Sequence, residues 1–192
     1  MSGHNKWKQI KERKGKTDSQ KSKAFSKYAK LITVEAKIAN GNREAPGLKA
    51  VIERAKKDNM PNDNIERAIK KATEVGAGQM ENITYEAYGP GGVAIIIEAL
   101  TDNRNKAAQE IKIALGKHDI SLASPGSAMW AFEKKPITDN SSLITENHAH
   151  GETSLQPTTT IALGDEDLIM LEKIVEDLES CDEVQEVITN AE

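Results

Sequence analysis

The chain has 192 residues, 38% hydrophobic and 29% charged, which is enough to bury a core in one domain or two small ones. Its net charge of −4 conceals an asymmetry, because residues 1–75 hold 19 Lys and Arg against 9 Asp and Glu, whereas residues 76–192 hold 7 against 21. The single cysteine, Cys181, excludes an internal disulfide framework and a cysteine-rich zinc site, and the longest apolar run, Val93–Leu100, is too short to cross a bilayer.

The first part of the chain predicts a basic arm followed by three short helices. Residues 1–16 are polar and rich in lysine, so we expect little fixed structure there. Thr17 or Asp18 can cap a helix whose apolar residues recur at helical spacing. A second helix is expected to begin at Pro46, and a third at the capping-box pattern Asp63-Asn64-Ile65-Glu66.

The pattern changes to strands after Glu81. Thr84–Tyr88 and Val93–Leu100 read as strands joined by a glycine-rich turn, and the second is apolar on both faces, as in a central strand. Thr101 or Asp102 is expected to cap the following helix. The elements expected after it are a strand at Ser127–Glu133, a strand at Thr158–Leu163, a helix at Asp165–Ser180 and a strand at Glu183–Thr189.

Together these elements predict an α+β protein. An N-terminal three-helix domain is followed by a small, mostly antiparallel sheet domain, with the strands in one sheet and two helices on one face. We expect the helical domain with its arm in residues 1–78, the α/β domain in residues 79–133 plus 157–192, and an irregular connector in residues 134–156.

The basic N-terminal region is the strongest candidate for a binding site. The first thirty residues carry ten Lys and Arg against two acidic residues, and such a charge attracts phosphates without regard to base sequence. Lys23, Lys27 and Lys30 share one helical face, although a merely solvated lysine face is the alternative. The residues predicted to contact nucleic acid are His4, Lys6, Trp7, Lys11, Arg13, Lys14, Lys21, Lys23 and Lys27.

Two further features allow more than one interpretation. Trp7 either stacks on an unpaired base or packs on the helical bundle, and packing is preferred. The cluster Thr101-Asp102-Asn103-Arg104-Asn105 begins a helix, and Asn103, Arg104 and Asn105 are more polar than capping requires. We therefore keep these three residues as a possible secondary site for phosphate, RNA or another domain.

The sequence contains no motif that indicates catalysis. A Gly-x-x-x-x-Gly-Lys phosphate loop, a Gly-x-Ser-x-Gly elbow and a dinucleotide fingerprint are all absent. His148 and His150 have the spacing of a metal pair, but a solvated connector explains them better. We expect a protein that is not an enzyme, with no cofactor, no metal and no small-molecule substrate.

Several blocks of sequence resemble the YebC family. They are Gly3-His4-Asn5-Lys6-Trp7 with Ile10-Lys11 and Arg13-Lys14, then Ala55–Arg67, Tyr85–Ala94, Thr101–Asn105 and the C-terminal Leu168–Ala191. The resemblance implies three domains, one all-helical and two α/β, with the second formed from segments on either side of the third. It also implies a regulator without enzymatic activity: members are named as DNA-binding transcriptional regulators, while others act as translation activators or relieve stalled ribosomes.

The chain departs from the family pattern in two places. Asn5 stands where serine is usual, and the 23 residues of 134–156 are too few for an α/β third domain. We expect a cytoplasmic regulator of gene expression, in the first place a DNA-binding transcriptional regulator. Ribosomal or transfer RNA is the alternative partner, with an effect on translation, and a protein-interaction module without nucleic acid is the second alternative. No membrane partner is expected.

Overall fold

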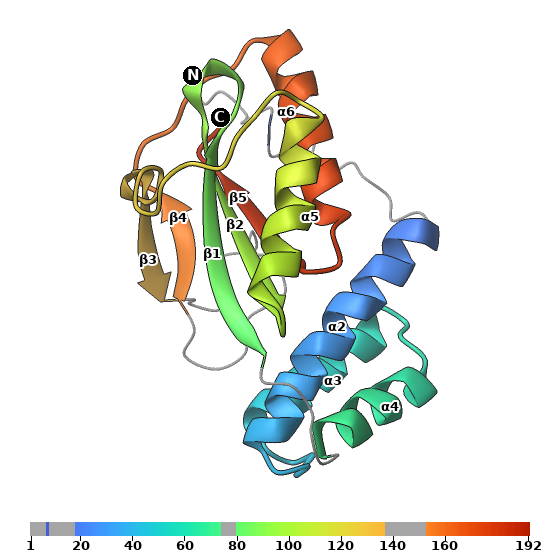
Figure 1. Cartoon of the computed structure of the whole chain (residues 1–192). Coiled ribbons are helices and arrows are strands. Elements are labelled where there is room, and N and C mark those ends of the chain that lie inside the picture. The colour runs from blue at the N-terminus through green and yellow to red at the C-terminus, as the bar shows by residue number, and fades with distance from the viewer. Residues whose placement is uncertain (1–6, 8–17, 74–79, 137–152) are drawn as a thin grey trace. The chain divides into compact units, whose positions relative to one another are not determined.

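The computed structural model describes residue 7 and residues 18–73, 80–136 and 153–192 (Figure 1). The chain divides into two compact units. The helical unit contains Ser19–Met80 and Lys134–Ser154, and the sheet unit contains Met1–Asp18, Glu81–Glu133 and Leu155–Glu192. Three helices followed by an antiparallel α/β arrangement confirm the predicted fold class.

Three helices form the helical unit: α2 (Asp18–Ile38), α3 (Pro46–Lys57) and α4 (Asn62–Thr73). Each presents one apolar stripe to a common core, as its helical periodicity requires. The core consists of Tyr28, Ile32, Ala36, Leu48, Val51, Ala55, Met60, Ile65, Ala68, Ile69 and Ala72. Tyr28 adds a polar link, because its hydroxyl donates to Asp58 Oδ2 at 3.0 Å.

Short turns with left-handed residues connect these helices. After α2, Gly41 has a φ of 78° and its N–H donates to the Ala36 carbonyl at 2.8 Å, which ends the helix in the way glycine favours. Between α3 and α4, Asn59 has a φ of 64°. Helix α4 begins at Asn62, one residue before the predicted capping box, so Asp63 lies within the first turn.

The sheet unit is built on three antiparallel strands in the order β1-β2-β5. They are β1 (Glu81–Tyr88), β2 (Ala94–Thr101) and β5 (Val184–Thr189). In the register of the first pair, Tyr88 lies opposite Ala94 and Glu81 opposite Thr101. Seven of the eight residues of β2 are buried, which confirms the predicted central strand.

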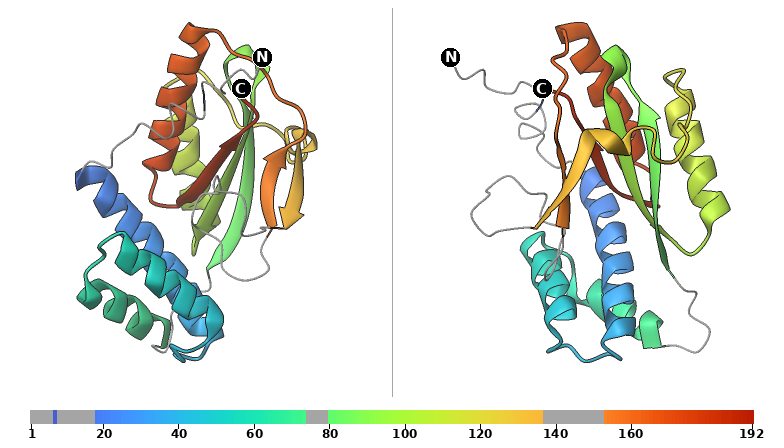
Figure 2. Two further views of the ribbon diagram at one scale, coloured as in Figure 1. Left: turned by 180° about the vertical axis from the view of Figure 1, so that it is seen from behind. Right: turned by 90° about the vertical axis from the view of Figure 1, so that its left-hand side faces the viewer.

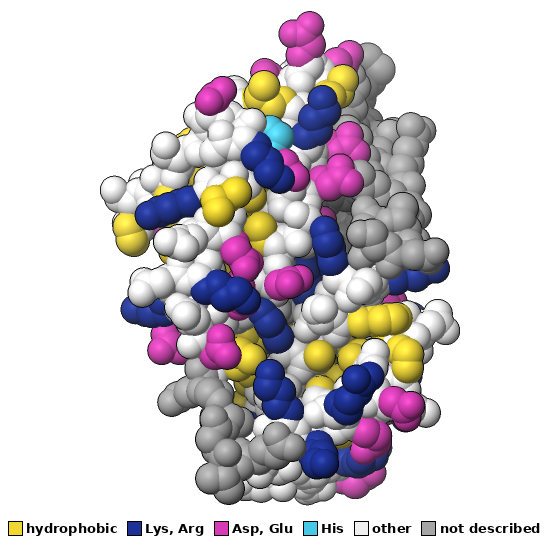
Figure 3. All heavy atoms as spheres, turned by 45° about the vertical axis from the view of Figure 1, so that its right-hand side comes forward, with side chains coloured by type: hydrophobic (Ala, Val, Ile, Leu, Met, Phe, Trp, Pro, Cys, Tyr) yellow, Lys and Arg dark blue, Asp and Glu magenta, His cyan; other side chains and the backbone are white. Residues whose placement is uncertain are grey.

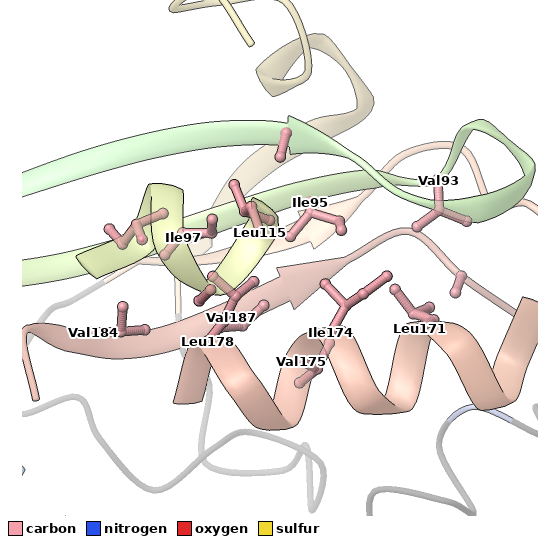
Figure 4. Close-up of a cluster of buried hydrophobic side chains, with 14 of the residues drawn as sticks. Val93, Ile95, Ile97, Leu115, Leu171, Ile174, Val175, Leu178, Val184 and Val187 are labelled. Carbon is pink, nitrogen blue, oxygen red and sulfur yellow. The ribbon is translucent and has the colours of Figure 1, made fainter. Parts of the chain in front are cut away.

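Helices α5 (Arg104–Gly116) and α6 (Asp165–Glu179) cover one face of this sheet (Figures 1 and 2). Figure 4 shows apolar side chains from β2, β5, α5 and α6 meeting between the two layers. The largest fully buried members include Ile95, Ile97, Ile111, Leu115, Leu171, Ile174 and Leu178. The prediction of two helices on one face is therefore confirmed.

A second, two-stranded sheet pairs β3 (Phe132–Pro136) with β4 (Thr153–Pro157), and of these strands Phe132, Glu133 and residues 155–157 belong to the sheet unit. A small apolar cluster joins the two sheets, in which Phe132 and Leu155 pack with Ala94 and Ile96. Because β2 alternates its side chains between the two faces, it contributes to both clusters.

The strand predictions in this region need correction. The sequence predicts one sheet, whereas the structure has two. Residues 129–131 form a short 3-10 helix, η2, so the strand predicted at Ser127–Glu133 begins only at Phe132. The sequence predicts a strand at Thr158–Leu163, but the strand of this region, β4, ends at Pro157. Of the predicted residues, Ile161 forms an isolated bridge with Ala191. Both ends of the predicted irregular connector are thus strand residues.

Candidate nucleic-acid interface

A row of lysines lies on α2 opposite its core-facing side. The row consists of Lys23, Lys27, Lys30 and Lys37, with spacings of four, three and seven residues. At about 100° per residue these positions fall on one face, whereas Tyr28, Ile32 and Ala36 fall on the other. Helical periodicity therefore separates the charge from the core. We call Lys23, Lys27, Lys30 and Lys37 the lysine row.

The sequence identified most of the lysine row but not all of it. Lys37 was missed, although the same spacing extended by two turns would have found it. Lys21 is exposed but lies about 200° around the helix from Lys23, so it does not extend the row. Lys23 forms no ion pair with any other residue that the structure describes. His4, Lys6, Lys11, Arg13 and Lys14 lie outside the described residues.

The helical unit keeps an excess of positive charge after its own ion pairs are considered. Residues 18–73 hold 13 Lys and Arg against 7 Asp and Glu. Arg43 pairs with Glu66, and this hydrogen bond raises the pKa of Arg43, while Lys49 Nζ lies 3.2 Å from Glu44 Oε2. None of these four residues belongs to the lysine row. Acidic and basic side chains are interspersed on the face drawn in Figure 3.

Trp7 is not available to stack on a base in this structure. Its side chain is 6% exposed and belongs to the apolar cluster beneath α5 and α6, which also contains Leu171 and Ile174. Its burial favours the packing alternative over stacking, and a contact of Trp7 with nucleic acid stays a prediction. The structure corrects the expected packing partner, because the indole packs in the sheet unit and not on the helical bundle.

The polar cluster at the start of α5 is largely occupied by local structure. Asn103, not Thr101 or Asp102, is the N-cap, and its Oδ1 accepts from the backbone N–H groups of Asn105 at 3.1 Å and Lys106 at 3.2 Å. The Thr101 hydroxyl fixes the preceding turn by donating to the Asn103 carbonyl at 3.0 Å. The Asn103 side chain therefore has a structural role, and a binding role for Arg104 and Asn105 stays a prediction.

The cations of this cluster are also paired within the sheet unit. Arg104 Nε lies 3.0 Å from Glu81 Oε2. Lys106 Nζ donates to Glu183 Oε1 at 2.6 Å, and this hydrogen bond is the main reason that the pKa of Lys106 is raised. Since the Glu183 side chain is only 3% exposed, the pair anchors α5 to the start of β5. These charges stabilise the fold in the first instance.

Two descriptions of protein families match the chain. The TACO1/YebC protein N-terminal domain matches residues 5–75, and the TACO1/YebC second and third domain matches residues 80–148. The chain belongs to the TACO1/YebC family. The two matches take in most of the first four blocks from which the resemblance was inferred, and the fifth block, Leu168–Ala191, lies beyond them.

Relatives of known name agree with this assignment. A probable transcriptional regulatory protein of Carboxydothermus hydrogenoformans is 38% identical over 241 aligned positions, covering 100% of this chain and 99% of the relative. One from Dictyoglomus turgidum is 42% identical over 197 positions, covering 100% of this chain and 72% of the relative. The crystal structure of a conserved hypothetical protein, Aq1575, from Aquifex aeolicus superposes with a TM-score of 0.76 at 30% identity, covering 91% of each chain.

The chain is shorter than these members of the TACO1/YebC family. The Carboxydothermus alignment spans 241 positions against 192 residues here, and the match to the second and third domains ends at residue 148. Both observations agree with the shortened segment 134–156. Among the described residues, no helix is long and apolar enough to cross a membrane and no group of three His, Cys, Asp or Glu could hold a metal. His148 and His150 lie outside the described residues.

Proposed function

We propose that this chain is a nucleic-acid-binding regulator of gene expression that binds DNA through its helical unit and carries out no catalytic step. The observation that carries the proposal is the lysine row, which lies on one face of α2 with the apolar core of the unit on the other. The names of the relatives, probable transcriptional regulatory proteins, support the regulatory part of the proposal.

The geometry of the row suits a phosphate backbone. From Lys23 to Lys37 it extends about 20 Å along the helix axis, at 1.5 Å per residue. Lysine ammonium groups at that spacing neutralise several successive phosphates and release condensed counterions, which supplies affinity without base specificity. Contacts of this kind position a protein on a duplex, whereas sequence is read at base edges.

The first prediction concerns the salt dependence of binding to a short labelled DNA duplex. If about six phosphates are neutralised, log affinity should fall with log salt at a slope near −5 between about 50 and about 200 mM. The triple variant Lys23→Gln, Lys27→Gln, Lys30→Gln should bind more weakly and reduce the magnitude of that slope by about 3. Fluorescence anisotropy measures both quantities.

The matched control changes three exposed lysines of the same unit that lie outside the lysine row. Lys56→Gln, Lys70→Gln, Lys71→Gln alters the net charge equally, but none of these residues lies on α2. The proposal expects the control to keep most of the affinity. Equal losses in the two triple variants would show a general charge effect and reject the lysine row as the interface. A slope near zero for the unaltered chain would reject nucleic-acid binding itself.

The same assay separates the alternatives from the main proposal. Preference for purified ribosomes over duplex DNA would favour a translation factor, and crosslinking in cells followed by sequencing of bound DNA and RNA would identify the target. If the chain is instead a protein-interaction module, it should show no salt-dependent affinity for DNA or RNA. Its protein partner should still bind the Lys23→Gln, Lys27→Gln, Lys30→Gln variant.

A further inference from the structure

Two aromatic side chains of the sheet unit form an exposed pair. Trp130, in the 3-10 helix η2, is 63% exposed, and Tyr88, the last residue of β1, is 38% exposed. The indole Nε1–H donates to the Tyr88 hydroxyl at 3.3 Å, which ties the two side chains together. Large exposed aromatics in a soluble domain indicate a recognition surface when they are held in place.

A buried carboxylate holds the loop that carries Trp130. Glu86 is 6% exposed, and its carboxylate accepts backbone N–H groups from Gly126 at 2.5 Å, Ala128 at 2.6 Å and Met129 at 2.9 Å. Charge-assisted bonds of this kind are among the strongest in proteins. Ala128 and Ala131, on either side of the Trp130 segment, are fully buried. The backbone beneath the indole is therefore fixed before any ligand arrives.

The polar groups of the pair are already used within the protein. The Trp130 N–H donates to Tyr88, and the Tyr88 hydroxyl donates to the Ser127 carbonyl. An extended peptide brings a carbonyl at every residue and needs donors on the surface that binds it. Because both donors of this pair are used within the protein, the rings present only their π faces to a ligand. A nucleobase requires only such a face for stacking.

We propose that Tyr88 and Trp130 form a stacking platform for an unpaired nucleobase. The proposal rests on the proposed function, in that basic residues elsewhere in the chain provide the phosphate contacts that an uncharged aromatic pair cannot. Stacking is tolerant of base identity, because every base has a π face. The chain would accordingly favour a nucleic acid with exposed bases over a fully paired duplex of equal length.

Intrinsic tryptophan fluorescence tests this inference on the full chain. Titration with a short single-stranded DNA should quench the emission, while the same strand in a duplex, whose bases already stack on one another, should bind without that quenching. Trp130→Phe should abolish the quenching yet keep most of the affinity, because a phenyl ring still stacks. Trp130→Ala should lower single-strand affinity about tenfold and leave duplex affinity within about twofold.

The outcomes distinguish failure of this inference from failure of the proposed function. Binding of single strands with no quenching, or equal single-strand affinity for Trp130→Ala and the unaltered chain, would reject the platform while leaving the phosphate interface intact. No affinity for single strand, duplex or heparin would reject the proposed function. Quenching by a proline-rich peptide but not by a single strand would assign the platform to a peptide and overturn the proposal.

A variant of Glu86 gives a second line of test that does not alter the rings. Glu86→Gln replaces one acceptor oxygen by an amide that cannot accept the loop N–H groups. It should weaken single-strand binding severalfold while duplex binding and the lysine-row salt slope are unchanged. Glu179→Gln, at an exposed position at the end of α6, is the control and should change neither. Unaltered single-strand binding in Glu86→Gln would show that the loop does not position the platform.

Discussion

Asp177 connects the ends of two helices through a single carboxylate. Lys117 Nζ, at the C-terminal end of α5, donates to Asp177 Oδ1 at 3.0 Å, and His118 Nε2 lies 2.9 Å from Oδ2. The hydrogen bond from Lys117, followed by the interaction with His118, lowers the pKa of Asp177 below its ordinary value of 3.8. Asp177 lies near the end of α6, so the cluster joins the ends of α5 and α6.

This cluster predicts how stability depends on pH. Because the pKa of Asp177 is lower in the folded chain than in the unfolded one, its contribution is fully present above the ordinary value of 3.8 and is lost as the pH falls through the folded pKa. Asp177→Asn should therefore lower the free energy of unfolding at neutral pH, and its difference from the unaltered chain should shrink below about pH 4.

Urea denaturation followed by circular dichroism across the acid range measures that difference. Asp119→Asn is the control, since it makes the same chemical change at an exposed carboxylate outside this cluster. A gap between Asp177→Asn and the unaltered chain that stays constant down to pH values well below 4 would contradict the assignment.

At the scale of single elements, helix α5 shows how a local signal can be displaced by one or two residues. The sequence correctly places a helix start after β2, but it selects Thr101 or Asp102, whereas Asn103 supplies the capping oxygen. All three residue types can cap, and the choice depends on the turn after Thr101, which its own hydroxyl organises.

The cap is a direct test of this assignment. Asn103→Ala should lower the free energy of unfolding by about 1 kcal/mol, because two N–H groups of the first turn lose their acceptor, while Asn103→Asp should retain the cap. Asn105→Ala, in which the side chain changes but the capped backbone N–H remains, should be nearly neutral. Denaturant titration of the three variants provides the comparison, and equal losses at positions 103 and 105 would contradict the capping role.

Elements with a strong local pattern could be predicted from the sequence, and elements set by distant contacts could not. The helices and β2 follow from apolar periodicity, and most of the lysine row follows from the same period. Strand β4 did not, because its segment has weak alternation and is organised by pairing with β3. Glu86, in β1, gives no local sign that its carboxylate captures three N–H groups some forty residues later.

Trp7 is the clearest case in the candidate site. The sequence left open a base contact and preferred packing on the helical bundle, but Trp7 packs in a core made by residues from Ala87 to Ala191. A short-range charge pattern carries no information about such a distant apolar partner. The Tyr88 and Trp130 pair was missed for the same reason, since the two residues are far apart in sequence and meet only through the folded loop.

At the scale of the whole molecule, the pairing of β3 and β4 explains how the chain can be shorter than its relatives. Strands β3 and β4 pair in one sheet, and Figure 1 shows the end of β3, at Pro136, beside the start of β4, at Thr153. The two ends of any segment inserted between Pro136 and Thr153 therefore lie next to each other. A long insertion and a short one can thus leave the rest of the sheet unit unchanged.

This arrangement predicts that residues 137–152 are dispensable for folding. Replacing them with Asn-Gly, which favours the two-residue hairpin turn, should preserve cooperative unfolding and the circular dichroism of the parent chain. Duplex affinity should also be retained, because the lysine row is on α2. A matched control inserts Asn-Gly within β2, where the two added residues would break the pairing with β1 and β5, place a polar turn in the core and abolish the transition. Loss of cooperative unfolding in the first variant would contradict the prediction.

The position of β5 in the sheet has a consequence for the order of events during synthesis. A nascent chain emerges from the N-terminal side, so α2, α3 and α4 can assemble as soon as Thr73 is free of the ribosome. Strand β2, however, can pair with β5 only after Val184 has been synthesised. Until then the backbone N–H and C=O groups along one edge of this apolar strand have no partner strand. The helical unit can thus form early, while β2 in the sheet unit keeps an unpaired edge until Val184 and the rest of β5 have been synthesised.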